Sequence, residues 1–199
     1  MKKLLVRGDD LGYSEGVTLG MLSAYEKGIV NSMAIMINMP YAKEAILLAK
    51  KHKGLCLGLH VNVTNGKALA PIDQIPTLVD ENGVFISSRF RREQLIKGEV
   101  LFNEDEAYLE AKYQIERYID WVGQLPEYID LHVLEVPELI NAVLRVYQEY
   151  QVPVCIYDKC FDKSIHEQAM KQYEYYQQHN NHFEDMFIKG DYQIKDGLN

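Results

Sequence analysis

A short apolar run, Leu55-Cys56-Leu57-Gly58-Leu59, follows Gly54 and ends at His60. Its length, its apolar composition and the glycine before it predict a buried strand that stops at the histidine. On both sides of this run, apolar strand-like segments alternate with stretches whose apolar residues recur at helical spacing. Such alternation is typical of β-strand–α-helix units. The sequence therefore predicts an α/β fold with a mainly parallel sheet, either doubly wound or curled into a barrel.

The expected elements follow one another over the first 157 residues. Residues 8–12, Gly-Asp-Asp-Leu-Gly, are expected to form a loop after the first strand. Residues 66–100 have no sustained period and are expected to form a long loop, which is usually functional or an insertion. Strands are expected at residues 4–6, 29–38, 55–60, 128–132 and 152–157. Helices are expected at 14–28, with Ser14 as the N-cap and Gly28 as a left-handed C-terminal residue, at 40–51, with Pro40 in the first turn, at 105–122 and from 137 onward.

A change in composition after Asp158 predicts the domain organisation. Residues 1–157 are expected to form the α/β domain, and residues 158–199 a divergent polar C-terminal segment of the same domain. Gln, Tyr, Asn and His dominate that segment, which is expected to hold at most one helix, around residues 164–176. A chain of 199 residues suits one domain with a sizeable core.

The composition excludes several classes of protein. With 47% apolar and 25% charged residues, the chain is neither disordered nor of low complexity. A net charge of −8 argues against nucleic-acid or anionic-membrane partners and fits a small neutral or cationic substrate. Three cysteines without Cys-x-x-Cys spacing argue against a disulfide framework or a zinc ribbon. No apolar run is long enough to span a membrane, and the N-terminal one stops after Val6, too soon for a signal peptide. A cytoplasmic location is therefore expected.

Four side chains of metal-ligand type fall where strands are expected to end: Asp9, Asp10, His60 and His132. The carboxyl ends of parallel strands share one edge, so these groups are expected to converge. One carboxylate and two imidazoles suit a catalytic divalent ion with open positions, most naturally zinc, and the second acid is then free to act as a base. Two plainer interpretations stay open at this point: a solvated acidic turn, and histidines that only form structural hydrogen bonds.

Three motifs carry a resemblance to a known family. Residues 7–14, Arg-Gly-Asp-Asp-Leu-Gly-Tyr-Ser, resemble the Asn-Ala-Asp-Asp-Phe-Gly opening of the YdjC-like carbohydrate deacetylases, which include chitooligosaccharide deacetylases. Residues 58–64 are similar to the family's Gly-(Leu/Met/Val)-His-x-x-Leu-Thr block. Residues 129–132 are similar to the start of its Ile-Asp-Ser-His-x-x-x-His block. The resemblance covers about residues 1–157, and the order and spacing of the motifs make it specific.

The resemblance implies an irregular or incomplete (β/α) barrel and metal-dependent hydrolysis of N-acetyl groups from amino sugars or chitooligosaccharides. Asp10, His60 and His132 match the family's ligands of a divalent ion, zinc or magnesium, and Asp9 matches its catalytic base. The expected partner is a small acetylated sugar, without nucleic acid or membrane, and the protein is expected to be a homodimer.

The sequence also departs from the family's pattern. Arg7 and Gly8 replace Asn-Ala, Leu131 replaces the serine of the third motif, and Val136 stands in place of its last histidine. The family's later Cys-His-Pro segment, which looks like the source of a general acid, has no counterpart here. Besides an enzyme with low turnover, two hypotheses stay open. One is a degenerate member that binds metal and an acetylated sugar or a partner without efficient turnover. The other is a truncated chain that is stable only as an oligomer.

Overall fold

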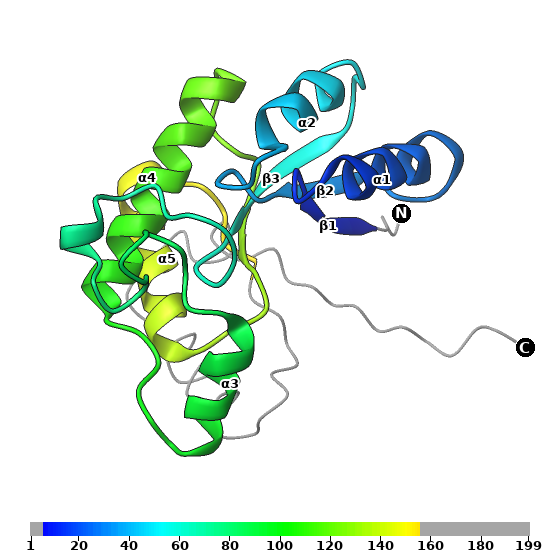
Figure 1. The fold of residues 1–199 in the computed structure, drawn as a ribbon. Coiled ribbons are helices and arrows are strands. Elements are labelled where there is room, and N and C mark those ends of the chain that lie inside the picture. Colours follow the sequence, from blue (N-terminus) through cyan, green and yellow to red (C-terminus); the bar gives the residue numbers. More distant parts are fainter. Residues whose placement is uncertain (1–5, 156–199) are drawn as a thin grey trace, which may run out of the picture.

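Four parallel strands form one sheet in a computed structural model that describes residues 6–155. The strands are β1 (Arg7–Leu11), β2 (Ser32–Ile35), β3 (Cys56–Val61) and β4 (Ile129–Leu131), and they lie side by side in sequence order. Figure 1 shows β1, β2 and β3 next to one another. Every neighbouring pair is parallel. In a doubly wound sheet the strand order reverses at a switch point, whereas here each new strand is added on the same side, as in a barrel.

Helices make the crossovers that parallel pairing requires. Helix α1 (Glu15–Lys27) joins β1 to β2, and α2 (Ala42–Ala49) joins β2 to β3. The connection from β3 to β4 contains the short 3-10 helix η1 (Ile72–Gln74) and the helices α3 (Ser88–Ile96) and α4 (Glu104–Val122). Helix α5 (Pro137–Tyr150) follows β4 and packs against α4 (Figure 1). The prediction of an α/β fold with a mainly parallel sheet is confirmed.

The chain continues the sheet beyond β4. Val154 forms a parallel bridge with Ile129, within the stretch 152–157 where a fifth strand is expected. Within residues 6–155 the sheet does not close into a complete barrel. The helix expected around residues 164–176 and the segment 158–199 lie outside the described residues. In the described part, no helix has the length and apolar character needed to cross a membrane.

The core lies around the sheet, in which β2, β3 and β4 are almost entirely buried, whereas β1 is partly exposed. All four residues of β2 are buried, as is usual for the short apolar strands of parallel sheets. Helix α5 contributes its apolar side in the register that the sequence predicts, with Pro137 at its start. The core formed by the sheet and its helices includes the buried side chains of Met33, Ile35, Leu59, Ile115, Tyr118, Ile140, Val143 and Leu144.

Four expected features are corrected by the structure. The strand β1 covers Arg7–Leu11, so the acidic stretch is an irregular strand rather than a loop. Residues 66–100 contain α3, which apolar spacing could not reveal because Arg91 is its one buried residue. Pro40 lies before the first turn of α2, which begins at Ala42. Gly28 ends α1 with a φ of −118°, so it is not left-handed.

The buried side of α4 is polar where it meets the β3–β4 connection. The carboxylate of Glu110 is fully buried and accepts hydrogen bonds from the backbone N–H groups of Leu69 and Ala70. Gln114 pairs with both backbone groups of Asn62. Since a buried backbone group must find a partner, these contacts fix the chain that leaves the end of β3.

Candidate metal centre

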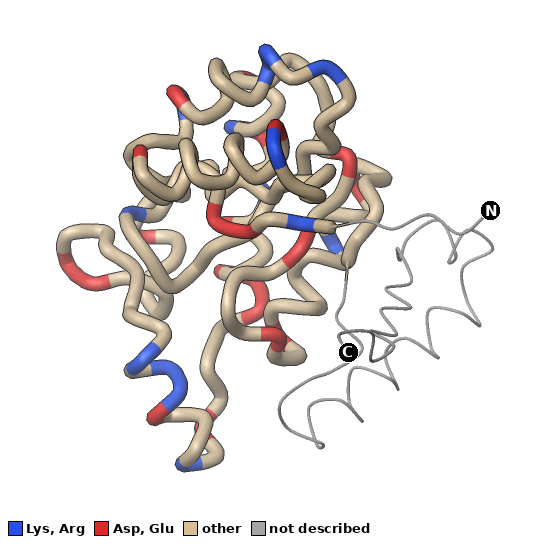
Figure 2. Tube along the Cα trace, turned by 90° about the vertical axis from the view of Figure 1, so that its right-hand side faces the viewer, with Lys and Arg blue, Asp and Glu red and all other residues tan. Residues whose placement is uncertain are grey.

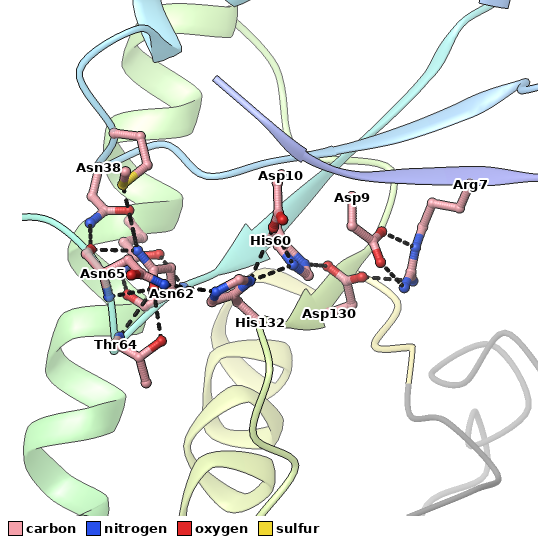
Figure 3. A network of polar contacts seen from close by, with 12 residues as sticks. Arg7, Asp9, Asp10, Asn38, His60, Asn62, Thr64, Asn65, Asp130 and His132 are labelled. Carbon is pink, nitrogen blue, oxygen red and sulfur yellow. Dashed lines mark hydrogen bonds and ion pairs between the residues drawn. The ribbon is translucent and has the colours of Figure 1, made fainter. Parts of the chain in front are cut away.

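A β-bulge directs both Asp9 and Asp10 toward the edge where the strands end. Gly8 lies opposite Met33 and Leu11 opposite Ile35, so two acids of β1 oppose the single residue Ala34. Neighbouring side chains of a regular strand point to opposite faces. Here Asp10 has a φ of +70°, a left-handed conformation that aspartate tolerates better than most residues. Both carboxylates consequently extend to the same side of the strand (Figure 3).

Three atoms from three strand ends meet at one place. Oδ1 of Asp10 lies 3.0 Å from Nδ1 of His132 and 3.3 Å from Nε2 of His60, and the two ring nitrogens are 3.2 Å apart. Both histidines are buried, whereas 40% of the Asp10 side chain is exposed, so the group opens to solvent on one side. This group of Asp10, His60 and His132 is called the triad below.

The triad fits a divalent ion of the first transition row. Ligand bonds of 2.0–2.1 Å place neighbouring ligand atoms about 3.3 Å apart in tetrahedral geometry and about 2.9 Å apart at right angles. The three measured distances fall in this interval. Oδ1 of Asp10 is also buried and, among the described residues, forms no hydrogen bond of acceptable geometry. An ion held by all three atoms would satisfy this oxygen and leave further coordination positions open.

His60 is oriented from behind by a buried carboxylate. His60 and Asp130 are register partners on β3 and β4, and Nδ1 of His60 lies 2.8 Å from Oδ1 of Asp130. An ionised carboxylate can only accept, so when the ring is neutral its hydrogen lies on Nδ1, and Nε2 is free for an ion, which would displace any second proton. Burial lowers the pKa of His60, but the charge of Asp130 and the contact with Asp10 outweigh it and raise that pKa to about 10. Close contact with His132, and then with His60, holds the pKa of Asp10 well below its usual range.

Arg7 links Asp9 to the same cluster. Its Nε lies 2.6 Å from Oδ1 of Asp9, its Nη2 lies 3.2 Å from Oδ2, and its Nη1 lies 2.6 Å from Oδ2 of Asp130. Burial lowers the pKa of Arg7, but the two carboxylates outweigh it and raise that pKa above its ordinary value. The arginine that replaces the family's asparagine is thus a bridge between two acids. Asp9 lies beside the triad rather than in it, within 4.8 Å of ligand atoms of His60 and Asp130.

The charges of this cluster match a divalent ion. Asp9, Asp10 and Asp130 supply three negative charges and Arg7 one positive charge, which leaves an excess of two when both histidines are neutral. Figure 2 shows several acidic segments near the middle of the trace with a basic segment among them. Since uncompensated buried charge is costly, a +2 ion would balance this group.

Several contacts around the candidate site were not predicted from the sequence. Asp130 stands in the third motif, two residues before His132, but its contact with His60 depends on strand register. Asn65 lies 2.9 Å from Nε2 of His132 and is held by Asn62 and Asn38 (Figure 3). Val133 has a φ of +68°, and a hydrogen bond from Leu134 N–H to the His132 carbonyl closes a tight turn directly after His132. The only sequence feature that pointed to these contacts was Asn62, which lies in the motif around His60.

Comparisons with known proteins agree with the motifs. The sequence profile described as YdjC-like protein matches residues 3–196, and so continues through the segment that starts at residue 158. A carbohydrate deacetylase of Geobacillus stearothermophilus is 36% identical over 154 residues, which is 75% of this chain and 58% of that protein. A carbohydrate deacetylase of Brevibacillus brevis is 38% identical over 155 residues, 76% of this chain and 58% of that protein. A chitooligosaccharide deacetylase of Serratia marcescens is 36% identical over 131 residues, 66% of this chain and 49% of that protein.

A solved structure supports the same relationship. It comes from Enterococcus faecalis V583 and is provisionally designated a cellobiose-phosphate cleavage protein. It superposes with a TM-score of 0.71 at 28% identity, over 85% of this chain and 65% of the other. The chain spans about three fifths of the length of most of these curated relatives. Because the profile matches almost the whole of this chain, the chain belongs to the YdjC-like family.

Proposed function

We propose that this chain carries the metal site of a carbohydrate deacetylase that removes N-acetyl groups from amino sugars or chitooligosaccharides. The observation that carries the proposal is the convergence of Asp10, His60 and His132, with all three distances between 3.0 and 3.3 Å. The deacetylase names of its relatives support the reaction and the substrate class. Two imidazoles and one carboxylate favour zinc over magnesium, which prefers oxygen ligands and retains its waters.

Each residue of the cluster has a proposed task. The triad would hold the ion, which when bound polarises the amide carbonyl and makes a water more acidic. Asp9 would accept the proton of the attacking water, since its carboxylate lies beside the triad and is 41% exposed. Asp130 would keep Nε2 of His60 free of hydrogen, and Arg7 would hold the carboxylates of Asp9 and Asp130 in place.

None of the histidines in the described part of the chain is placed to give the leaving amine its proton. Of the histidines there, His60 and His132 belong to the triad, and His52, which follows α2, lies 3.6 Å from Glu26 of α1. An amine expelled without a proton is a poor leaving group, so we expect low turnover from this chain alone. The histidines at positions 166, 179 and 182 lie outside the described residues. The homodimer and the cytoplasmic location remain predictions from the sequence.

Metal analysis followed by an assay tests the proposal. The purified full chain would be loaded with zinc, its metal content measured, and acetate release from diacetylchitobiose followed, with His132→Ala as the negative control. One zinc per chain together with acetate release that His132→Ala abolishes would support the deacetylase. Stoichiometric zinc without acetate release would favour the degenerate family member. A chain that binds no zinc or other divalent ion would contradict the metal site.

A further inference from the structure

The two histidines of the triad are oriented by different kinds of group. Behind His60 lies the charged carboxylate of Asp130, 2.8 Å from Nδ1. Behind His132 lies the neutral carboxamide of Asn65, 2.9 Å from Nε2. The ring atoms that face the centre of the triad differ accordingly, Nε2 in His60 and Nδ1 in His132 (Figure 3).

Asn65 is held in place at both ends of its backbone. Its N–H donates to Oδ1 of Asn62, 3.0 Å away. Its carbonyl accepts from Nδ2 of Asn62 at 2.7 Å and from Nδ2 of Asn38 at 2.9 Å. Asn62 is fully buried and is bound in turn by Gln114 of α4. Asn65 is therefore fixed relative to the ends of β2 and β3, which is the rigidity that an orienting side chain needs.

The proton count of the imidazole decides how Asn65 acts. A neutral ring carries one N–H, and the nitrogen that binds an ion must be without hydrogen. Nδ1 of His132 lies in the triad, so the hydrogen belongs on Nε2, where it needs an acceptor. In the structure Nδ2 of Asn65 lies 2.9 Å from Nε2 of His132. The two orientations of a carboxamide are assigned from hydrogen bonding, and a half-turn of the group brings the acceptor Oδ1 to the place of Nδ2.

We propose that Asn65 is the positioning residue of His132: its Oδ1 accepts the hydrogen bond from Nε2–H and thereby makes His132 a ligand through Nδ1. The inference rests on the proposed function in taking the triad as a metal site. A neutral acceptor also suits the charge balance, because the cluster already carries the two excess negative charges that a divalent ion compensates.

The binding mode of wild-type protein is the first measurement. Long-range proton–nitrogen NMR of the zinc-loaded full chain distinguishes a metal-bound ring nitrogen from a protonated one, and His132→Gln assigns the signals. We expect His132 to be bound through Nδ1 and protonated at Nε2, and His60 to be bound through Nε2. Binding of His132 through Nε2 would overturn the inference.

Zinc affinity of variants, measured by chelator competition, is the second measurement. Asn65→Leu removes the acceptor and should weaken zinc binding about 10- to 100-fold. Asn65→Asp keeps an acceptor oxygen and should bind zinc at least as tightly as wild type. The matched control is Asn141→Leu, which removes another half-buried asparagine whose carboxamide donates to Glu104 of α4, and it should leave zinc affinity unchanged. Thermal unfolding of the metal-free variants reports whether each of them folds.

The outcomes separate this inference from the proposed function. Wild-type affinity in Asn65→Leu would overturn the positioning role, and so would an equal loss in Asn65→Asp and Asn65→Leu. If Asn65→Leu fails to fold, Asn65→Asp and the wild-type NMR measurement still decide. A wild-type chain that binds no divalent ion would contradict the metal site itself, whereas zinc binding with the other ring nitrogen would contradict the role of Asn65 alone.

Discussion

Oδ1 of Asp10 on β1 lies 3.0 Å from Nδ1 of His132, which follows β4, although β2 and β3 lie between these strands. In a flat sheet the two outer strands would be roughly 14 Å apart, at about 4.8 Å per strand. An aspartate and a histidine side chain cannot span that distance, so the sheet curls and brings its first and last strands together. The arrangement of the triad is thus a product of barrel-like curvature.

Replacing His132 by alanine should abolish metal binding and leave the fold intact. The ring contributes one of three ligand atoms, and the backbone N–H of residue 132, which donates to Val61, is kept. We expect zinc content per chain to fall from about one to near zero, with the circular dichroism of the metal-free protein unchanged. A variant that still holds one zinc would show that the ion binds elsewhere.

Replacing Asp9 by asparagine should remove hydrolysis but keep the metal. Asp9 pairs with Arg7 and lies outside the triad, and loss of a general base usually costs about 10²- to 10⁴-fold in rate. The measurement is acetate release at matched zinc content. Activity within a few-fold of wild type would mean that another group is the base, and Glu135→Gln would then be tested, since burial raises the pKa of Glu135 to about 8.

Replacing Val133 by glycine should stabilise the metal-free protein. A φ of +68° strains a β-branched residue by about 1–2 kcal/mol, and glycine relieves this strain but costs about 0.5–1 kcal/mol in chain entropy. A net gain of about 0.5–1 kcal/mol is expected in chemical unfolding. Val84→Gly is the control, because Val84 is similarly exposed but has no positive φ, and it should be neutral or destabilising. Destabilisation by Val133→Gly would show that the tight turn after His132 is not strained.

Replacing Glu110 by glutamine should change how stability depends on pH. Burial raises the pKa of Glu110 to about 7 from an ordinary value of 4.5, against the effect of its N–H donors. Between these values the folded protein retains a proton that the unfolded chain has released, so this group makes stability fall as pH rises from about 4.5 to about 7. The fall is about 3 kcal/mol and is complete above pH 7.

The comparison needs unfolding free energies at pH 5 and pH 8. The difference in unfolding free energy between wild type and Glu110→Gln isolates the contribution of the Glu110 carboxyl group. The control is Glu116→Gln, because Glu116 lies on the same helix and is exposed. Parallel pH profiles of wild type and Glu110→Gln would mean that the Leu69 and Ala70 N–H groups keep Glu110 ionised in the folded state.

Periodicity in the sequence was enough to predict most of the elements. The run before His60 became β3, the apolar spacing after Pro137 became α5, and Ser14 caps α1 by accepting from the Val17 N–H. These features depend on neighbours along the chain, because strand alternation, helical spacing and capping are local. For the same reason the sequence was enough to predict that Asp9, Asp10, His60 and His132 lie near strand ends. The roles of these four residues remain predictions.

Contacts between distant segments were decided by the tertiary structure. Pattern alone could not show the bulge at Asp9 and Asp10, the helix α3 that buries Arg91, or the meeting of Asn65 with His132. Each of these depends on which polar groups are brought together when the sheet curls and α4 covers the β3–β4 connection. A buried polar side chain is stable only if folding provides its partner, and that partner lies elsewhere in the sequence, where no local period records it.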